Sequence, residues 1–428
     1  MNALSQLVDT WVSRAAADQR KGRAGRVQAG YCFRLHKTEQ RTLLPQQIPE
    51  MHRIGLEQLC LSIKMLKLDA SYPSIHGFLS TAVVEPPAST AIHAAVALLR
   101  EIGALEHATE ALTPLGHHLG SLPMDCRVAK CVLYGCLLKC IDPMLTIAAT
   151  MAGRSPWLNS PDLRDSMETI KSSLVAKNPG SFSDHLLLVS LFDAYRVAGN
   201  KRAFCKTHCV SAEGMATIAK LRQQFKRDLV GIGFLTEVSP STFELLYNCF
   251  ASEPRVVKAA LTGGLYANVI QVIYPQQKYI AAAHGTVAAD NTSQSLKFFT
   301  KREFTKTRVF LHPSSTNFKT SSFGNSAWLI YNAAVQTSKI FVRESSKVAP
   351  YALLLFGGED LVIAHEAATV TMDGWMVFNA EPKIAILIKT LRRHLTTLLK
   401  DKIEAPQLDI SQSPLVKAII HLLITEGM

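Results

Sequence analysis

Long hydrophobic runs are missing from this sequence: no apolar stretch in its 428 residues reaches the roughly 18 residues that span a membrane. We therefore expect a soluble chain without a membrane partner. Cysteine is sparse, with nine residues and none of the dense, even spacing of secreted disulfide scaffolds, which indicates reduced thiols inside the cell, in the cytoplasm or nucleus. Acidic residues are a minority, 34 against 46 lysines and arginines, and the net charge of +12 favours an anionic polymer as partner, although solubility alone would also explain it.

The signatures of a complete ATP-binding site are absent as well. The sequence contains no G-x-x-x-x-G-K-[ST] loop to cradle phosphates and no D-E-x-H segment after a strand to hold magnesium. No repeat of fixed period occurs, which argues against a solenoid. With 48% hydrophobic residues, a chain of this length predicts about three globular domains.

Arginine and glycine crowd one short segment, QRKGRAGR at residues 19–26. Guanidinium groups bind phosphate oxygens in pairs, so Arg23 and Arg26, three residues apart on one expected helical turn, suit a polyphosphate. The two glycines allow the backbone to turn sharply. A solvated basic turn without a ligand would contain the same residues. The arginine- and alanine-rich start of the chain is also typical of a mitochondrial transit peptide.

The segment resembles the QRxGRAGR motif of superfamily 2 helicases, and LVDTWVSRAAAD at residues 7–18 resembles the DEAH/RHA group of RNA helicases. The resemblance implies that Arg23 and Arg26 touch the γ-phosphate of ATP between two RecA-like domains, with Gln19 orienting the attacking water or a phosphate oxygen. ATP and Mg²⁺ would bind only together with a RecA-like core, most of which would lie upstream of Met1. Alone, the chain is expected to bind RNA without hydrolysing ATP. Residues 1–37 would end the second RecA-like domain, with a strand that polar and apolar alternation predicts at 30–35.

Prolines and polar residues mark a boundary at residues 38–49. Beyond it, apolar spacing predicts a helix at 51–66, a second helix from Pro86 that ends at Gly103, and a short hairpin around 107–111. This order is typical of a winged helix, which we assign to residues 38–118, and LTPLG at 112–116 resembles the family there.

Residues 119–253 are predicted to form a helical bundle, which the resemblance identifies with the family's ratchet, or helicase-associated, domain. Four cations on one predicted helix form a candidate RNA-binding face or an ordinary solvated helix surface: Lys220, Arg222, Lys226 and Arg227. Four cysteines fall inside an apolar helical pattern that is more typical of buried thiols than of a metal site, so we expect no metal: Cys126, Cys131, Cys136 and Cys140.

Gly263 and Gly264 are interpreted as the end of the helical pattern, because the sequence afterwards becomes β-rich. Five or six strands, enough for a small closed barrel, are predicted at 269–274, 279–283, 309–312, 328–335, 340–342 and 376–378. LHPSS at 311–315 and DGW at 373–375 resemble the family's OB fold, assigned to residues 254–383, which leaves 384–428 as a helix and tail.

Cations and phenylalanines alternate within this OB region. The candidate contacts to single-stranded RNA are Lys297, Lys301, Arg302, Lys306 and Arg308. The phenylalanines between them would either stack on bases or, in the interpretation we favour, fill the barrel core: Phe298, Phe299, Phe304 and Phe310.

The predicted fold class is therefore multi-domain and mainly α with a C-terminal β-barrel: a RecA-like remnant, a winged helix, a helical ratchet bundle and an OB fold. The resemblance implies the C-terminal part of an ATP-dependent RNA helicase that couples hydrolysis to 3′ to 5′ unwinding or remodelling, with a protein activator on the OB surface or a ribonucleoprotein assembly as further partners. A non-catalytic RNA-binding scaffold descended from a helicase is the alternative. A winged-helix DNA regulator would need a basic recognition helix, whereas residues 90–100 are mostly alanine, valine and leucine.

Overall fold

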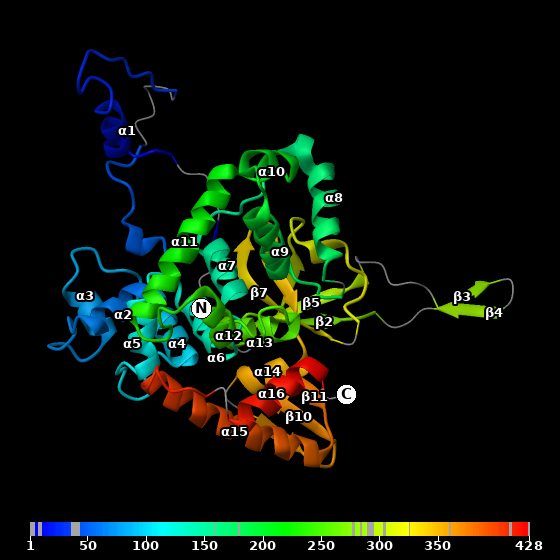
Figure 1. Cartoon of the computed structure of the whole chain (residues 1–428). Coiled ribbons are helices and arrows are strands. Elements are labelled where there is room, and N and C mark those ends of the chain that lie inside the picture. Colours follow the sequence, from blue (N-terminus) through cyan, green and yellow to red (C-terminus); the bar gives the residue numbers. More distant parts are fainter. Residues whose placement is uncertain are drawn as a thin grey trace.

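The computed structural model describes residues 5–6, 11–35, 43–158, 160–178, 180–275, 279–282, 285–288, 295–302, 305–324, 326–358, 361–410 and 413–426. Helices make up the left and upper parts of the molecule in Figure 1, a β-barrel lies to their right, and the C-terminal helices lie below. Helix α1 stands off from this body at the upper left.

The N-terminal region contains β1 (Ser5–Gln6) and α1 (Arg14–Lys21). The Ser13 hydroxyl accepts a hydrogen bond from the Ala16 N–H and so caps α1, as serine does at helix starts. The strand predicted at residues 30–35 is wrong, because residues 31–35 form no ladder and the side chains of Tyr31, Phe33 and Leu35 are exposed. A strand needs a neighbour to pair its backbone, and no described strand adjoins this segment.

Four short helices follow and pack around buried Leu61, Ile75 and Leu99. They are α2 (Glu57–Met65), α3 (Ile75–Thr81), α4 (Ser89–Ile102) and α5 (Pro114–Ser121). The predicted end of α4 is confirmed, since Gly103 caps it with a φ of 83°. Leu105 and Leu112 form an isolated antiparallel bridge where the short hairpin was predicted.

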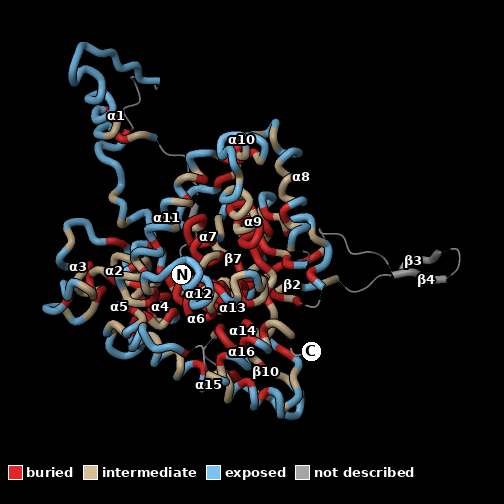
Figure 2. The backbone as a smooth tube through the Cα atoms, viewed as in Figure 1, coloured by how far each residue is buried: buried red, intermediate tan, exposed pale blue. Residues whose placement is uncertain are grey.

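The central helices carry many of the buried residues seen in Figure 2. They are α6 (Cys126–Leu137), α7 (Ile141–Ala152), α8 (Arg164–Val175), α9 (Asp184–Val197), α10 (Lys201–Thr207), α11 (Ala212–Gly231), α12 (Pro240–Tyr247) and α13 (Pro254–Leu265). Helical content between residues 119 and 253 is as predicted.

The helix break predicted at Gly263 and Gly264 occurs one residue later, because both glycines lie inside α13, which ends at Leu265, and are buried. A Cβ added to Gly264 would lie 2.5 Å from the Cys131 amide nitrogen and 2.6 Å from the Arg127 carbonyl oxygen. The glycines therefore do not end the helix; they allow α13 to approach the backbone of α6.

The barrel closes through five strands in the order β7, β2, β5, β6, β8 and back to β7, which confirms the predicted closed barrel. The strands are β2 (Val269–Ile273), β5 (Lys297–Arg302), β6 (Thr305–Leu311), β7 (Trp328–Gln336) and β8 (Ile340–Lys347). Its core includes Ile270, Val309, Phe323, Leu329 and Val342. β1 pairs in parallel with Val335 and Gln336, the last two residues of β7.

Two predicted strands do not belong to the barrel, and one barrel strand was missed. β3 (Tyr279–Ala282) pairs with β4 (Gly285–Ala288) as a separate hairpin. β11 (Met376–Asn379) joins β9 (Leu361–Ala364) and β10 (Thr369–Met372) in a second sheet. The missed strand is β5, because Lys297 and Lys301 occupy two of its outward positions and lysine is depleted in strands.

The C-terminal region contains α14 (Pro350–Phe356), α15 (Pro382–Glu404) and α16 (Pro414–Thr425). The amphipathic helix predicted at 384–399 is confirmed as part of α15, which packs on the second sheet and on α14. α16, in the tail that sequence analysis left without a predicted element beyond the helix before it, contacts α13 and α15. Within the described ranges, none of the helices combines the length and apolarity of a membrane span.

Candidate nucleic-acid interface

The outer surface of β5 and β6 gathers the cations of the OB region. In this antiparallel pair Phe299 lies opposite Arg308 and Lys301 lies opposite Lys306. Successive side chains of a strand point to opposite faces, and the alternate residues Phe298, Thr300 and Val309 are buried. The outward residues, which we call the β5–β6 face, are Lys297, Phe299, Lys301, Lys306, Arg308 and Phe310. Arg302 ends β5, and its side chain lies outside the described part of the chain.

Cations and aromatic rings alternate closely on this face. The guanidinium carbon of Arg308 lies 5.7 Å from the ring centroid of Phe299 and 5.2 Å from that of Phe310. The ammonium of Lys339, from the turn between β7 and β8, lies 4.6 Å from the Phe310 ring. Such contacts hold the charges beside rings that remain partly open to solvent.

The four phenylalanines do not share one environment. Phe298 is only 8% exposed and its ring centroid lies 6.3 Å from that of Phe323, so the core interpretation is confirmed for it. For Phe299 and Phe310 that interpretation is wrong, because alternation along β5 and β6 turns them outward. Phe304 lies outside the described residues.

The basic surface continues onto β8. Sequence analysis predicted a strand there but missed its part in this surface. Phe310 pairs in parallel with Phe341, and the neighbouring Arg343 is exposed. The His312 ring centroid lies 6.0 Å from that of Phe341. The pKa of His312 is lowered mainly by its partial burial and further by the positive charges of Arg343 and Lys171. The parallel pairing of β6 with β8 places Phe341 opposite Phe310, 31 positions earlier in the chain, and so brings Arg343 onto this surface. The alternation of residues 340–343 was the one local signal.

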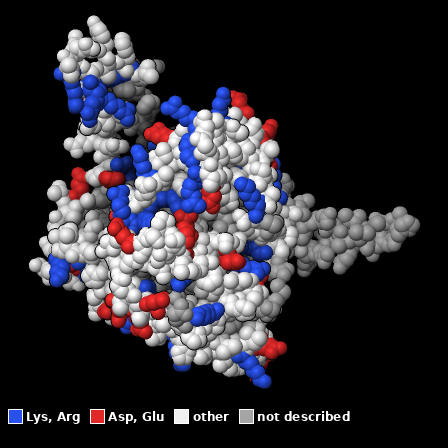
Figure 3. Space-filling model, in the orientation of Figure 1, with Lys and Arg blue, Asp and Glu red and all other residues white. Residues whose placement is uncertain are grey.

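Helix α11 divides its four cations between two sides. Residues seven apart lie nearly above one another on a helix, so Lys220 and Arg227 share one exposed side. Arg222, which is half-buried, and Lys226, which is exposed, lie on the other side. Figure 3 shows lysine and arginine side chains gathered over α11 and its neighbours. The ammonium of Lys226 lies 3.6 Å from the centroid of the Phe243 ring.

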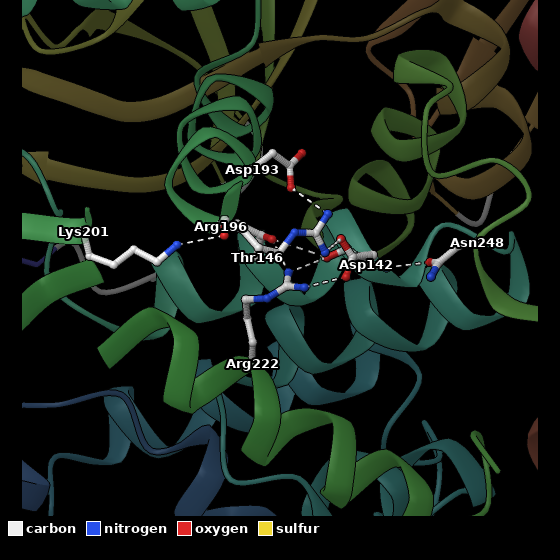
Figure 4. Close-up of polar contacts among 7 residues, drawn as sticks. All are labelled: Asp142, Thr146, Asp193, Arg196, Lys201, Arg222 and Asn248. Atoms are coloured by element: carbon white, nitrogen blue, oxygen red, sulfur yellow. Dashed lines mark hydrogen bonds and ion pairs between the residues drawn. The ribbon is translucent and has the colours of Figure 1, made fainter. Parts of the chain in front are cut away.

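Arg222 is turned into the helical core, as Figure 4 shows. It forms an ion pair of 2.5 Å with the carboxylate of Asp142 and donates to the carbonyl oxygen of Asp142 at 2.7 Å. It also donates to the Thr146 hydroxyl, and its guanidinium lies 4.8 Å from the Phe192 ring centroid. Arg196 approaches the same carboxylate at 3.5 Å. This arrangement joins α7, α9 and α11, and its role in the fold is to tie these helices together.

Arg23 and Arg26 lie in the turn that follows α1 and not together on one helical turn, whereas Gln19 lies on α1 itself. α1 ends at Lys21, and Gly25 reverses the chain with a φ of 85°. The Arg26 side chain donates through Nε to the Gly22 carbonyl at 3.1 Å. Gln19, Arg23 and Arg26 are all exposed, and no acidic side chain of the described residues forms an ion pair with either arginine. The motif and the β5–β6 face lie at different ends of the molecule (Figure 1), so the structure does not bring them together.

The four cysteines of α6 and its end are buried, which confirms their interpretation as core thiols. Burial raises the pKa of Cys126, Cys131 and Cys136 to about 12, so these thiols are neutral at physiological pH. Among the described residues, His, Cys, Asp and Glu side chains form no cluster of three that could hold a metal ion.

Comparison with known families adds three matches in order along the chain. A helicase-associated, ratchet-like domain (HA2) matches residues 125–188, an oligonucleotide/oligosaccharide-binding (OB) fold matches residues 257–360, and a C-terminal domain found in RNA helicases matches residues 368–425.

Relatives match across nearly the whole chain. It is 35% identical to the ATP-dependent RNA helicase dhx29 of Xenopus laevis, over 99% of this chain and 30% of that protein. It is 34% identical to the DExH-box ATP-dependent RNA helicase DExH1 of Arabidopsis thaliana, over 99% of this chain and 40% of that protein. It is also 34% identical to the ATP-dependent DNA/RNA helicase DHX36 of Homo sapiens, over 95% of this chain and 38% of that protein. The chain thus spans between 30% and 40% of the length of these three relatives.

Proposed function

Because the chain corresponds to the C-terminal portion of DExH-type RNA helicases, we propose that it holds single-stranded RNA for an ATP-dependent helicase. The β5–β6 face binds the strand, and the exposed side of α11, with Lys220 and Arg227, adds contacts to its phosphates. Arg222 has a structural role in this proposal, since its guanidinium is committed to Asp142.

One observation carries the proposal: cations and aromatic rings alternate on the outer surface of a closed five-stranded barrel. Lysine and arginine side chains attract phosphates, and partly exposed rings offer faces on which bases stack. Bases are accessible for stacking only where they are unpaired, so this combination favours a single strand over a duplex.

Coupling to ATP is proposed for Gln19, Arg23 and Arg26. Bound ATP would supply the phosphoryl group whose transfer to water releases energy. Two exposed guanidinium groups, for which the described residues supply no acidic partner, fit phosphate oxygens presented by another domain. Arg23 and Arg26 would bind those oxygens as negative charge develops on them, and Gln19 would orient the attacking water or a phosphate oxygen. Movement along RNA in the 3′ to 5′ sense follows from the family resemblance, and unwinding of duplexes with a 3′ or a 5′ overhang tests it.

Salt dependence of RNA binding tests the barrel surface. The measurement is the affinity of the 428-residue chain for a labelled oligouridine at several salt concentrations, with Lys297, Lys306 and Arg308 replaced by glutamine. Each phosphate contact to a single strand contributes about 0.7 to the slope of log K against log salt, so the triple variant should lower the slope by about 2.

A matched control removes the same charge from the exposed side of α15: Lys383→Gln, Arg393→Gln and Lys400→Gln. It should leave the slope unchanged. If both variants give the slope of the unsubstituted chain, the β5–β6 face does not bind RNA.

ATP hydrolysis tests the arginine motif in a protein that joins this chain to both RecA-like domains. Arg23→Ala or Arg26→Ala should lower RNA-stimulated hydrolysis on the order of a thousandfold, with RNA affinity nearly unchanged. Arg20→Ala, exposed on the last turn of α1, is the control. A large loss of RNA affinity would assign the arginines to RNA contact, and full activity of both variants would favour the non-catalytic scaffold.

A further inference from the structure

A pocket of about 530 Å³ opens where the β5–β6 face meets the second sheet. Its described lining residues are Lys301, Lys306, Gly374, Trp375 and Val377. The lysines come from facing positions on β5 and β6, and the other three come from the turn into β11 and from β11 itself. The pocket therefore combines two cations, one large aromatic ring and an apolar wall.

The turn that carries Trp375 is held in place by several contacts. Asp373 and Gly374 both have positive φ values, of 49° and 70°. The Tyr266 hydroxyl donates to the Asp373 carboxylate, and the Lys301 ammonium donates to the Asp373 carbonyl oxygen at 2.7 Å. The ring centroids of Trp375 and Trp328 lie 5.6 Å apart, and the two ring planes are nearly perpendicular, at 82°. Since these contacts involve only protein groups, the ring is positioned before any ligand enters, which lowers the entropic cost of binding.

The lysines keep hydrogen-bonding capacity toward the pocket. An ammonium group has three N–H donors. Among the described residues, Lys301 donates to Asp373 and Lys306 donates to the side chain of Gln271 at 3.1 Å. The Lys306 ammonium also lies 5.9 Å from the Trp375 ring centroid, so a phosphate between the lysines would lie within one nucleotide of that ring.

We propose that this pocket binds one nucleotide of single-stranded RNA, with its base stacked on Trp375 and its phosphate held by Lys301 and Lys306. This inference rests on the proposed function and specifies where the strand leaves the β5–β6 face. Val377, 53% exposed, would contact the free edge of the base or its sugar. A neutral ligand, such as a peptide without acidic side chains, would not use the positive charge of the two ammonium groups, which makes RNA the better fit.

A comparison of two ligands separates stacking from phosphate binding. The ligands are a short oligouridine and an abasic ribose-phosphate chain of equal length, and the protein is the full chain with Trp375→Leu. The unsubstituted chain should prefer the oligouridine, and the substitution should lower that preference about tenfold, equivalent to about 1.4 kcal/mol. Affinity for the abasic chain should stay the same. Trp375→Phe keeps an aromatic face and should retain most of the preference.

A preference that Trp375→Leu leaves unchanged overturns the inference. The proposed function is tested separately, because the triple glutamine variant on β5 and β6 reports on RNA binding as a whole. An altered salt slope in that variant, together with a base preference that Trp375→Leu leaves unaltered, would refute only the pocket. Because Trp375 packs on Trp328, leucine could loosen the fold. Photocrosslinking of the unsubstituted chain to 5-iodouridine RNA avoids this problem: a crosslink at Trp375 is expected, and crosslinks confined to other residues refute the inference.

Discussion

Replacing Arg222 by methionine tests whether this cation belongs to the RNA-binding surface or to the helical core. The Arg222 side chain is 11% exposed and that of its partner Asp142 is 24% exposed. Removing one member of a buried ion pair costs about 3–5 kcal/mol, because the other charge is left without compensation. Arg196 remains 3.5 Å from the same carboxylate and methionine keeps apolar contact with Phe192, so we expect the lower end, about 3 kcal/mol.

Hydrogen exchange measures this loss where it occurs. Amides of α7 and α11 that exchange by local opening should exchange about a hundredfold faster in Arg222→Met, whereas the salt slope of RNA binding should not change. The double variant Lys220→Gln and Arg227→Gln is the control on the exposed side of α11. It should leave exchange unchanged and lower the slope by about 1.4 if both residues contact phosphates. Unchanged exchange together with a lower slope in Arg222→Met would refute the structural role of Arg222.

Two further predictions concern stability. Gly264→Ala should destabilise the chain by about 3 kcal/mol in chemical denaturation, because the new Cβ would lie 2.6 Å from a backbone oxygen of α6. Gly231→Ala is its control, since nothing lies within 4 Å of that position in α11, and equal stabilities of the two variants would contradict close packing of α13 on α6. Burial lowers the pKa of His185 to about 4, against the opposing effect of Asp184. The stabilising contribution of neutral His185 is therefore complete above the unfolded pKa of about 6.5, and it is lost as the pH falls from 6.5 toward 4. His185→Asn should flatten the free energy of unfolding over that range by up to about 1.4 kcal/mol per pH unit, and parallel curves for the two proteins would show that His185 does not titrate there.

Local patterns predicted the elements whose side chains alternate between core and solvent. The end of α4 followed from Gly103, and α15 followed from its apolar spacing. The predictions that failed share one cause: the structure at those positions depends on contacts with residues far away in the sequence. Gly263 and Gly264 have the composition of a helix end, yet their role depends on α6, more than 120 residues earlier in the chain. The segment at 30–35 has the pattern of a strand, but a strand also needs a neighbour.

The candidate site was predictable in composition and only partly in geometry. Alternation along β5 would have separated outward Phe299 from buried Phe298, had Lys297–Arg302 been identified as a strand. A helical projection would have separated Lys220 from Arg222. The partner of Arg222, however, lies 80 residues away, and charge alone does not distinguish a cation that binds RNA from one that holds helices together.

The contacts between barrel and bundle limit how the proposed helicase could move its RNA. Asp184, buried at the start of α9, accepts hydrogen bonds from the Ser315 hydroxyl at 2.6 Å, the Thr316 amide at 2.8 Å and the Ser345 amide at 2.9 Å. Breaking such a network leaves a buried charge unpaired, which costs several kcal/mol, so sliding of the barrel against α9 is disfavoured. We therefore expect the barrel and α9 to move together as one support. Advance of the strand, in the proposed function, has to come from movement of the ATP-binding domains against this support and not from movement within it.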